Sequence, residues 1–222
     1  MIDYLLERYR HTVQRFVLVV HPSFEDQVRR HVERSAPSLD VDYATQANPT
    51  GMLDAILLAS DAARSRAVQR VWVTWCDQIG IHPRTIETVE RLSRERADAA
   101  AIFPTSRQQP PYIHFDRDME GRIAGVRQRR EGDEMPAVGE SDMGLFSLSA
   151  DAYFQLLPRF AAGATEARAT HERNFLPFLP WLVQHGHAVL TCPATDPLEA
   201  IGVNTPDDRH RLEAYLRTLE QS

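Results

Sequence analysis

Short apolar runs alternate with amphipathic segments along the first half of the chain. Residues 16–20 form a continuous apolar run (FVLVV), which is typical of a strand buried on both faces, whereas residues 2–13 repeat apolar positions at helical spacing. The alternation predicts strands at 16–20, 41–44, 70–75 and 99–103 and helices at 2–13, 23–34, 51–64 and 83–96. We therefore expect an α/β fold of Rossmann-like type, with a mostly parallel mixed sheet and helices on both faces.

The middle of the chain has a different pattern. Residues 112–116 and 122–128 predict a β-hairpin that turns near Gly121, and a polar loop follows at 130–140. The remaining segments predict strands at 145–149 and 187–192 and helices at 150–161, 174–185 and 206–219. Ser23 and Thr205 are expected N-caps. We expect one domain over residues 1–222, with 104–142 as an inserted hairpin and loop.

Composition and charge narrow the function. The chain has 222 residues, 43% of them hydrophobic, and a net charge of -6, so it lacks the general basic surface that nucleic-acid binding requires. The two cysteines indicate no disulfide framework, and no apolar run has the length of a membrane span. The first residues are amphipathic and lack the features of a signal peptide. We expect a cytoplasmic protein with no membrane or nucleic-acid partner.

Polar groups fall at the ends of predicted strands. Asp77 follows the apolar run 71–75, and further polar groups lie at 44–51 and 199–208. In open parallel sheets, ligands bind beyond the carboxyl ends of the strands, and a carboxylate there suits Mg²⁺. The alternative is structural: Asp77 could cap the following loop, and Asn204 and Asp208 could serve the start of the last helix. The pattern alone leaves both readings open.

Five segments carry a family resemblance. They are QANPTGMLDAILLA (46–59), VWVTWCDQIGIHPRTIETV (71–89), GRIAGVRQRR (121–130), GESDMGLFSLSADAY (139–153) and EAIGVNTPDDRHRLEAYL (199–216). Their order and spacing resemble those of nucleotidyltransferases. These include the sugar-1-phosphate nucleotidylyltransferases, such as the N-acetylglucosamine-1-phosphate uridylyltransferase domain, and the molybdenum-cofactor nucleotidyltransferases. The resemblance covers nearly the whole chain and implies a fold of the nucleotide-diphospho-sugar transferase type.

The resemblance also implies roles for single residues. Asp77 matches the aspartate that binds the catalytic Mg²⁺, and Asn204, with Asp207 or Asp208, matches the second metal-binding segment. Gln46 corresponds to the residue that hydrogen-bonds the nucleotide base, and Gly51 to a position where backbone approaches the base.

The acceptor side is implied in the same way. Gln128, Glu140 and Asp142 fall where relatives contact the sugar or another acceptor. Relatives often have Glu and Asn at the first and last of these positions, so the acceptor can differ from an ordinary hexose phosphate. The implied partners are an NTP and a phosphorylated small molecule.

One segment of the family pattern has no match. Relatives begin with a strand and a Gly-rich loop that carries Arg and, slightly later, Pro-Lys, and this loop cradles the triphosphate. All 25 Lys and Arg residues of this chain are Arg, so the signature lysine is not found elsewhere. We expect an N-terminally incomplete domain in which the neighbours of the absent strand, which is central in the sheet of relatives, have unpaired edges and catalysis is impaired.

Two functions compete on this evidence. The first is Mg²⁺-dependent nucleotidyl transfer, which needs no protein nucleophile and agrees with the lack of a Ser-His or Cys-His pattern. The alternative is a non-catalytic module that binds a nucleotide or sugar phosphate. A glycosyltransferase would carry Asp-x-Asp at the strand end, where this chain has WCDQ. Cys76 in that motif is expected to be a small buried hydrophobe.

Overall fold

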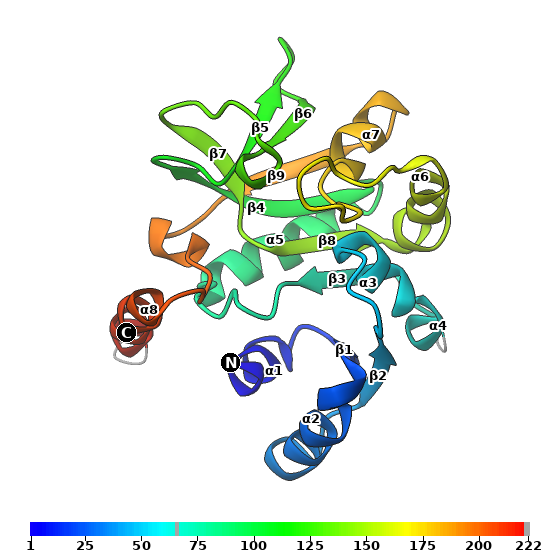
Figure 1. Ribbon diagram of the computed structural model, residues 1–222, viewed down its shortest axis with the longest axis vertical. Helices are drawn as coiled ribbons and strands as arrows, with labels where there is room; N and C mark the ends of the chain where they lie inside the picture. Colours follow the sequence, from blue (N-terminus) through cyan, green and yellow to red (C-terminus); the bar gives the residue numbers. More distant parts are fainter. Residues whose placement is uncertain (65–66, 220–222) are drawn as a thin grey trace.

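The computed structural model describes residues 1–64 and 67–219, with helices on both sides of a central sheet (Figure 1). The strands are β1 (Phe16–Val20), β2 (Val41–Thr45), β3 (Arg70–Thr74), β4 (Ala101–Gln108), β5 (Ile113–Arg117), β6 (Ile123–Gln128), β7 (Gly139–Asp142), β8 (Leu145–Ser149) and β9 (Val189–Pro193). The α-helices are α1 (Ile2–Tyr9), α2 (Pro22–Ser35), α3 (Met52–Leu58), α4 (Ser60–Ala63), α5 (Pro83–Glu95), α6 (Leu157–Gly163), α7 (Phe178–Gln184) and α8 (Pro206–Leu219). The 3₁₀ turns η1 (Arg129–Glu131) and η3 (Pro197–Ala200) and the π-helical turn η2 (Ala152–Leu156) complete the order.

The main sheet is mixed. Its strands follow the order β3-β8-β4-β7, and β9 pairs with β4. Among the described strands of this sheet, only the β4–β9 ladder is parallel, while β3–β8, β4–β8 and β4–β7 are antiparallel. The predicted sheet was mostly parallel. The difference arises because β8, from the second half of the chain, lies between β3 and β4 and runs against both.

The predicted hairpin is confirmed. β5 and β6 pair antiparallel as a separate two-stranded sheet, and Gly121 in their turn has φ +77°, a conformation that favours glycine. The loop predicted at 130–140 is partly ordered, since it begins within η1 and ends in β7. β7 pairs with the end of β4, which places the hairpin region beside the main sheet.

β1 and β2 form a parallel sheet of their own. Among the described strands, β1 pairs only with β2, and β3 pairs only with β8. β1 and β3 therefore each have one edge without a partner strand among the described residues. All five residues of β1 are half-buried although the run is entirely apolar. β1 and β3 both line one cavity of about 2370 Å³, which lies between the small sheet and the main one.

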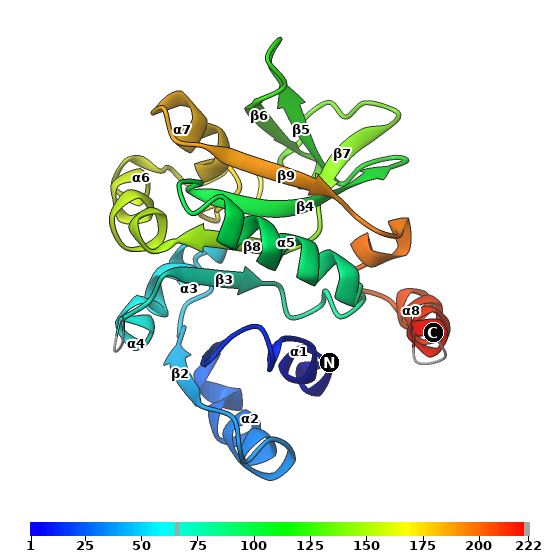
Figure 2. The same cartoon turned by 180° about the vertical axis from the view of Figure 1, so that it is seen from behind.

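Helices cover both faces of the main sheet, as predicted. On one face, Val89 of α5 and Tyr9 of α1 pack in a cluster with Ile102 of β4. Figure 2 shows α5 lying across this face. On the other face, Leu53 of α3 and Phe178 of α7 belong to the largest cluster, with α6 beside them. Since the two faces have separate clusters, the main sheet forms the middle layer of the fold.

Two helix starts test the expected caps. The N-cap of α2 is His21, not Ser23: the His21 Nδ1 atom accepts a hydrogen bond from Ser23 N at 3.2 Å. Thr205 is confirmed at α8, where its Oγ1 accepts from Asp208 N at 3.1 Å.

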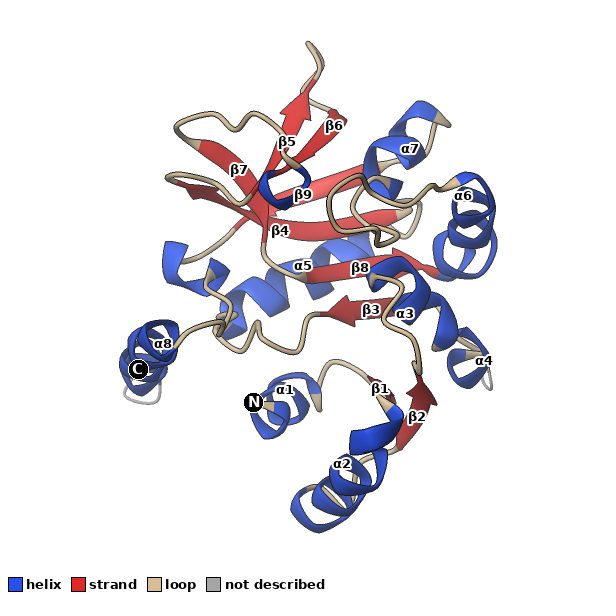
Figure 3. Cartoon of the chain, in the orientation of Figure 1, coloured by secondary structure: helices blue, strands red, loops and turns tan. Residues whose placement is uncertain are grey.

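The helix predicted at 51–64 is divided at Ala59 into α3 and α4, which Figure 3 shows as two short helices.

Within the described ranges, no helix has both the length and the apolar character needed to cross a lipid bilayer.

Candidate active site

Two distant segments meet at the carboxyl end of β3. Val203 N donates a hydrogen bond to the backbone oxygen of Asp77 at 3.1 Å. Gly202 lies against the Asp77 side chain, because a Cβ atom at Gly202 would be 2.6 Å from Asp77 Oδ2. The fold therefore brings Asp77 together with the segment that carries Asn204, as the sequence predicted.

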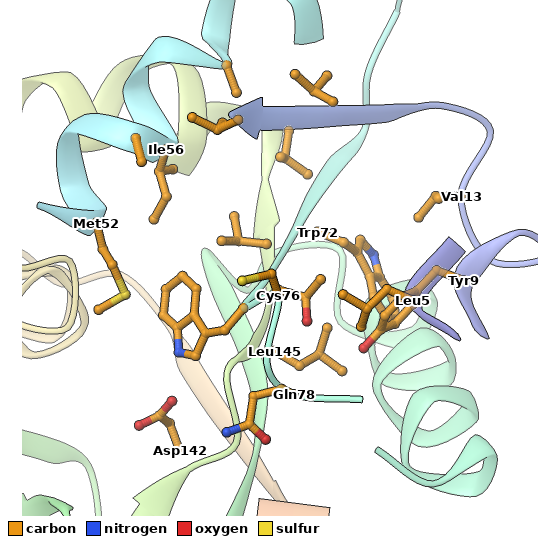
Figure 4. A pocket seen from close by; sticks show the side chains of 18 of the residues that line it. Leu5, Tyr9, Val13, Met52, Ile56, Trp72, Cys76, Gln78, Asp142 and Leu145 are labelled. Carbon is orange, nitrogen blue, oxygen red and sulfur yellow. The ribbon is translucent and has the colours of Figure 1, made fainter. Parts of the chain in front are cut away.

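This junction opens into the large cavity. Asp77, Asn204, Asp142 and Gln128 all line it. In Figure 4, Asp142 and Gln78 lie on one wall, Met52 and Ile56 on a second, and Leu5, Tyr9 and Val13 on the opposite side. The cavity lining is thus largely apolar, with a polar end where the loop after β3 begins and further charged side chains elsewhere, such as Arg70 and Glu90.

Burial perturbs two carboxylates at the polar end. Burial raises the pKa of Asp142 to about 6, although its carboxylate accepts hydrogen bonds from Gly144 N at 2.9 Å and from the Trp75 side chain. The nearby negative charge of Asp77 raises the same pKa further. Burial also raises the pKa of Asp77. Both groups therefore favour a cation or a proton more than a surface carboxylate does.

Asn204 and Asp208 lie at the start of α8. The Asp208 Oδ2 atom accepts hydrogen bonds from Thr205 N at 2.9 Å and Thr205 Oγ1 at 2.8 Å, which lower the pKa of Asp208. It also accepts from Asn204 N at 3.3 Å. Asp208 does not line the cavity, whereas the exposed Asn204 does. The structure thus gives Asp208 a capping contact, and its metal role stays a prediction.

Gln46 and Gly51 lie in the loop between β2 and α3, outside the residues that line the cavity. Gln46 Nε2 donates to the backbone oxygen of Gly51 at 3.3 Å, so the two residues contact each other. Gly51 has φ +124°, and a Cβ there would lie 2.5 Å from the backbone oxygen of Arg173. A close approach within the chain is therefore a sufficient reason for this glycine, and its base-binding role stays a prediction.

The acceptor-side residues divide into two groups. Gln128, which is buried, and Asp142 face the cavity. Glu140 lies apart, where Arg117 donates to its two oxygens at 2.5 and 2.7 Å. Burial alone would raise the pKa of Glu140, but the hydrogen bonds from Arg117 lower it. The predicted trio is therefore split, with Glu140 engaged by an arginine.

The comparison with known families follows this geometry. The family model for the MobA-like NTP transferase domain matches residues 1–142. The chain belongs to this family. The match includes Asp77, Gln128 and Asp142, while Asn204 lies beyond it. No match was found among curated proteins.

MobA-like NTP transferase domains are nucleotidyltransferases, which typically depend on Mg²⁺, and the residues at this junction suit that ion. Within the described residues, Asp77 has no ion pair, and Gln78 Oε1 is buried without a hydrogen-bond donor. No cluster of three His, Cys, Asp or Glu side chains is found in that part of the chain. Mg²⁺ needs only one or two carboxylates when waters and phosphates complete its octahedron, so this donor set is sufficient.

The basic side chains near the cavity of this MobA-like domain already have acceptors. Arg130 donates to Glu172 at 2.7 Å, and Arg70 donates to Ser147 Oγ at 2.7 Å. Arg94, which also lines the cavity, is paired with Glu90 at 2.7 Å. Neutralisation of a triphosphate by any of these three would require breaking an existing contact.

Cys76 differs from the expected buried hydrophobe. It is exposed, and it lines the cavity next to Asp77. The reason is the open edge of β3, which leaves the end of the strand uncovered. Partial burial and the adjacent Asp77 raise the pKa of the Cys76 thiol, so it is not activated as a nucleophile.

Gly202 was not among the predicted site residues. The only signal in the sequence is its place in GVNTPDD, two positions before Asn204. We expect Gly202→Ala to weaken Mn²⁺ binding about tenfold, because the new Cβ would displace the carboxylate of Asp77, the predicted metal ligand. Titration of Mn²⁺ by electron paramagnetic resonance (EPR) measures this. The control is Gly163→Ala, since no atom lies within 4 Å of a Cβ at that position. Equal affinities in the two variants would contradict the contact.

Asp142 provides a pH-dependent prediction for the metal-free protein. Since folding raises its pKa to about 6, the folded state favours the protonated carboxyl, and stability is lost as the pH rises from about 4 through 6. Asp142→Asn should therefore raise the free energy of unfolding by about 1–3 kcal/mol at pH 7.5. Below pH 4 the variant and the wild type should be equal. Urea unfolding at several pH values measures the difference, and a gain that is the same at pH 4 and pH 7.5 would contradict it.

Proposed function

We propose that this chain carries out Mg²⁺-dependent transfer of a nucleotidyl group from an NTP to a phosphorylated acceptor. An oxygen of the acceptor phosphate forms a bond to the α-phosphorus, the bond from that phosphorus to the bridging oxygen breaks, and pyrophosphate leaves. The supporting observation is the contact between Asp77 and the 202–204 segment at the end of β3. Two anions must approach in line, so positioning and charge neutralisation dominate such a reaction.

The chain supplies the binding groups for this chemistry. Mg²⁺, when bound, would neutralise the phosphates and polarise the α-phosphoryl group. Asp77 and Asn204 would hold the ion through carboxylate and amide oxygens. Gln128 and Asp142 line the same cavity and would orient the acceptor. Burial raises the pKa of Asp142 to about 6, so its carboxylate would accept a hydrogen bond from an acceptor hydroxyl at neutral pH, and its protonated form could donate one at lower pH.

The acceptor is proposed to be a sugar 1-phosphate or a similar small molecule. We also propose that turnover is slow. The support is that Arg70 and Arg130, which line the cavity, are engaged by protein acceptors and would have to break these contacts to neutralise the triphosphate. The same observation favours a second candidate, a module that binds a nucleotide or sugar phosphate without catalysis.

The transferase and the binding module differ in whether pyrophosphate is released. The chain is incubated with Mg²⁺, each of the four common NTPs and a panel of sugar 1-phosphates, and released pyrophosphate is measured. Slow, Mg²⁺-dependent release that requires an acceptor supports the transferase. Rapid turnover would contradict the proposed impairment. Binding of Mg²⁺ and NTP without any release would favour the module, and no binding at all would refute both.

A further inference from the structure

Hydrogen bonds join the segment before α8 to the loop after β3 and to the first turn of α5, and Figures 1 and 2 show these segments side by side. Thr195 N donates to Thr85 Oγ1 at 3.2 Å, and the hydroxyls of the same two residues are 3.0 Å apart. His82 N donates to Glu199 Oε2 at 2.8 Å, and Val203 N donates to the Asp77 backbone oxygen at 3.1 Å. The two segments run antiparallel, because residues 195, 199 and 203 contact residues 85, 82 and 77 in that order. The last bond in this series lies at Asp77 itself.

Glu199 makes the middle contact, and its side chain is fully buried at 0% exposure. Its Oε2 accepts from His82 N at 2.8 Å, and its Oε1 accepts from Asp196 N at 2.7 Å. Within the described residues, no cation forms an ion pair with it. A buried charge without a counterion is costly unless hydrogen bonds satisfy it. A carboxylate at this position therefore needs both backbone donors.

We propose that Glu199 is a positioning residue that fixes the spacing between Asp77 and Asn204, so that both face one metal ion. This inference rests on the proposed function. Glu199 lies five residues before Asn204, and its partner His82 lies five residues after Asp77, so the contact joins the two metal-binding segments. Groups that hydrogen-bond directly to metal ligands are worth about 10–100-fold in metal affinity. Glu199 acts through the backbone between the two segments, so we expect an effect at the lower end of that range.

The chemistry explains why a carboxylate is needed. The two N–H donors come from different segments, and only a carboxylate offers two acceptor oxygens in one rigid group. Glutamine has the same shape but a single acceptor oxygen, so one donor would lose its acceptor. Gly80, in the same loop, leaves room for α8, because a Cβ there would lie 2.6 Å from Leu212 Cδ2.

Two variants break the contact from opposite sides. Glu199→Gln removes one acceptor oxygen. His82→Pro removes the donor, and the His82 φ of −68° suits proline. Each has a matched control. Asp196→Asn keeps an acceptor for Leu198 N and does not touch the loop after β3. His82→Ala keeps the backbone N–H.

The experiment measures Mn²⁺ affinity by EPR in the presence of each of the four common NTPs, and amide hydrogen exchange of residues 199–204. We expect Glu199→Gln and His82→Pro to bind Mn²⁺ at least about tenfold more weakly and to exchange faster at 199–204, while both controls remain near the wild type. Wild-type affinity in both contact-breaking variants would overturn the inference.

The failure of the proposed function gives a different result. In that case, Mn²⁺ binding by the wild type would be absent or unaffected by Asp77→Asn. Hydrogen exchange then decides whether Glu199 holds the two segments together. Unchanged exchange in Glu199→Gln and His82→Pro would overturn the positioning role as well.

Discussion

Asp77→Asn is expected to weaken the binding of Mg²⁺ with NTP by about a hundredfold and to abolish pyrophosphate release, because the charged ligand contributes several kcal/mol to such a site. Asparagine has the same size, and the backbone contact from Val203 does not depend on the side chain. The fold should therefore persist. Isothermal titration calorimetry with each of the four NTPs, with and without Mg²⁺, measures the change.

The control for Asp77 is Asp151→Asn. Asp151 is also an aspartate that follows a strand of the main sheet, but it is exposed and does not line the cavity. We expect wild-type binding from this variant. Equal losses in both variants would point to a general effect of charge, and no loss in Asp77→Asn would show that the metal lies elsewhere.

Gly51→Ala is expected to lower the free energy of unfolding by about 3 kcal/mol or more, since positive-φ strain and overpacking each cost about 1–3 kcal/mol. At φ +124°, the new Cβ would meet the backbone oxygen and nitrogen of Arg173 at 2.5 and 2.6 Å. Arg173 cannot easily retreat, because its guanidinium is bonded to Asp54 and its backbone to Thr50 and Leu53. Urea denaturation of the two proteins measures the loss.

Gly132→Ala is the control that separates the cost of a positive φ from the cost of steric overlap with a new Cβ. Gly132 has φ +84°, yet a Cβ there would meet no atom within 4 Å. This variant should lose only about 1 kcal/mol, the usual penalty for a left-handed residue other than glycine. If Gly51→Ala lost no more than Gly132→Ala, the packing of Arg173 against this glycine would be refuted.

The pattern of neighbouring residue types predicted helices, strands and turns correctly where local interactions determine them. The apolar run at 16–20 became β1, and the helix opened by Pro83 became α5. Gly121 was placed correctly in the hairpin turn because its residue type and flanking strands point to the same conformation. The N-cap of α2 was assigned wrongly to Ser23, because histidine is a less common cap than serine and the Nδ1 contact cannot be read from spacing.

The pairing of β-strands was harder to predict, because it depends on contacts between segments that are distant in the sequence. Nothing in residues 145–149 indicates that β8 inserts between β3 and β4. The half-exposure of β1 and the exposure of Cys76 have the same physical cause, the cavity between two sheet edges. An apolar run predicts that a strand can be buried, but it does not specify what covers it.

The sequence predicted that the segments of Asp77 and Asn204 form the candidate site, but it did not predict the contacts of Glu199 or the raised pKa of Asp142. Strand-end position placed Asp77 near Asn204, which the Val203 hydrogen bond supports. Glu199 was missed, although Asp196 and Glu199 have the spacing of a capping box and that pattern was a usable signal. The raised pKa of Asp142 depends on burial beside Asp77, which no local pattern contains.

The most direct test of the proposed metal site is a crystal structure of the chain grown with Mn²⁺ and a non-hydrolysable NTP, using the anomalous signal of manganese. We predict one Mn²⁺ peak about 2.1–2.2 Å from an Asp77 carboxylate oxygen, with Asn204 and the nucleotide phosphates beside it. A bound nucleotide whose Mn²⁺ peak lies away from Asp77 would contradict the proposed site.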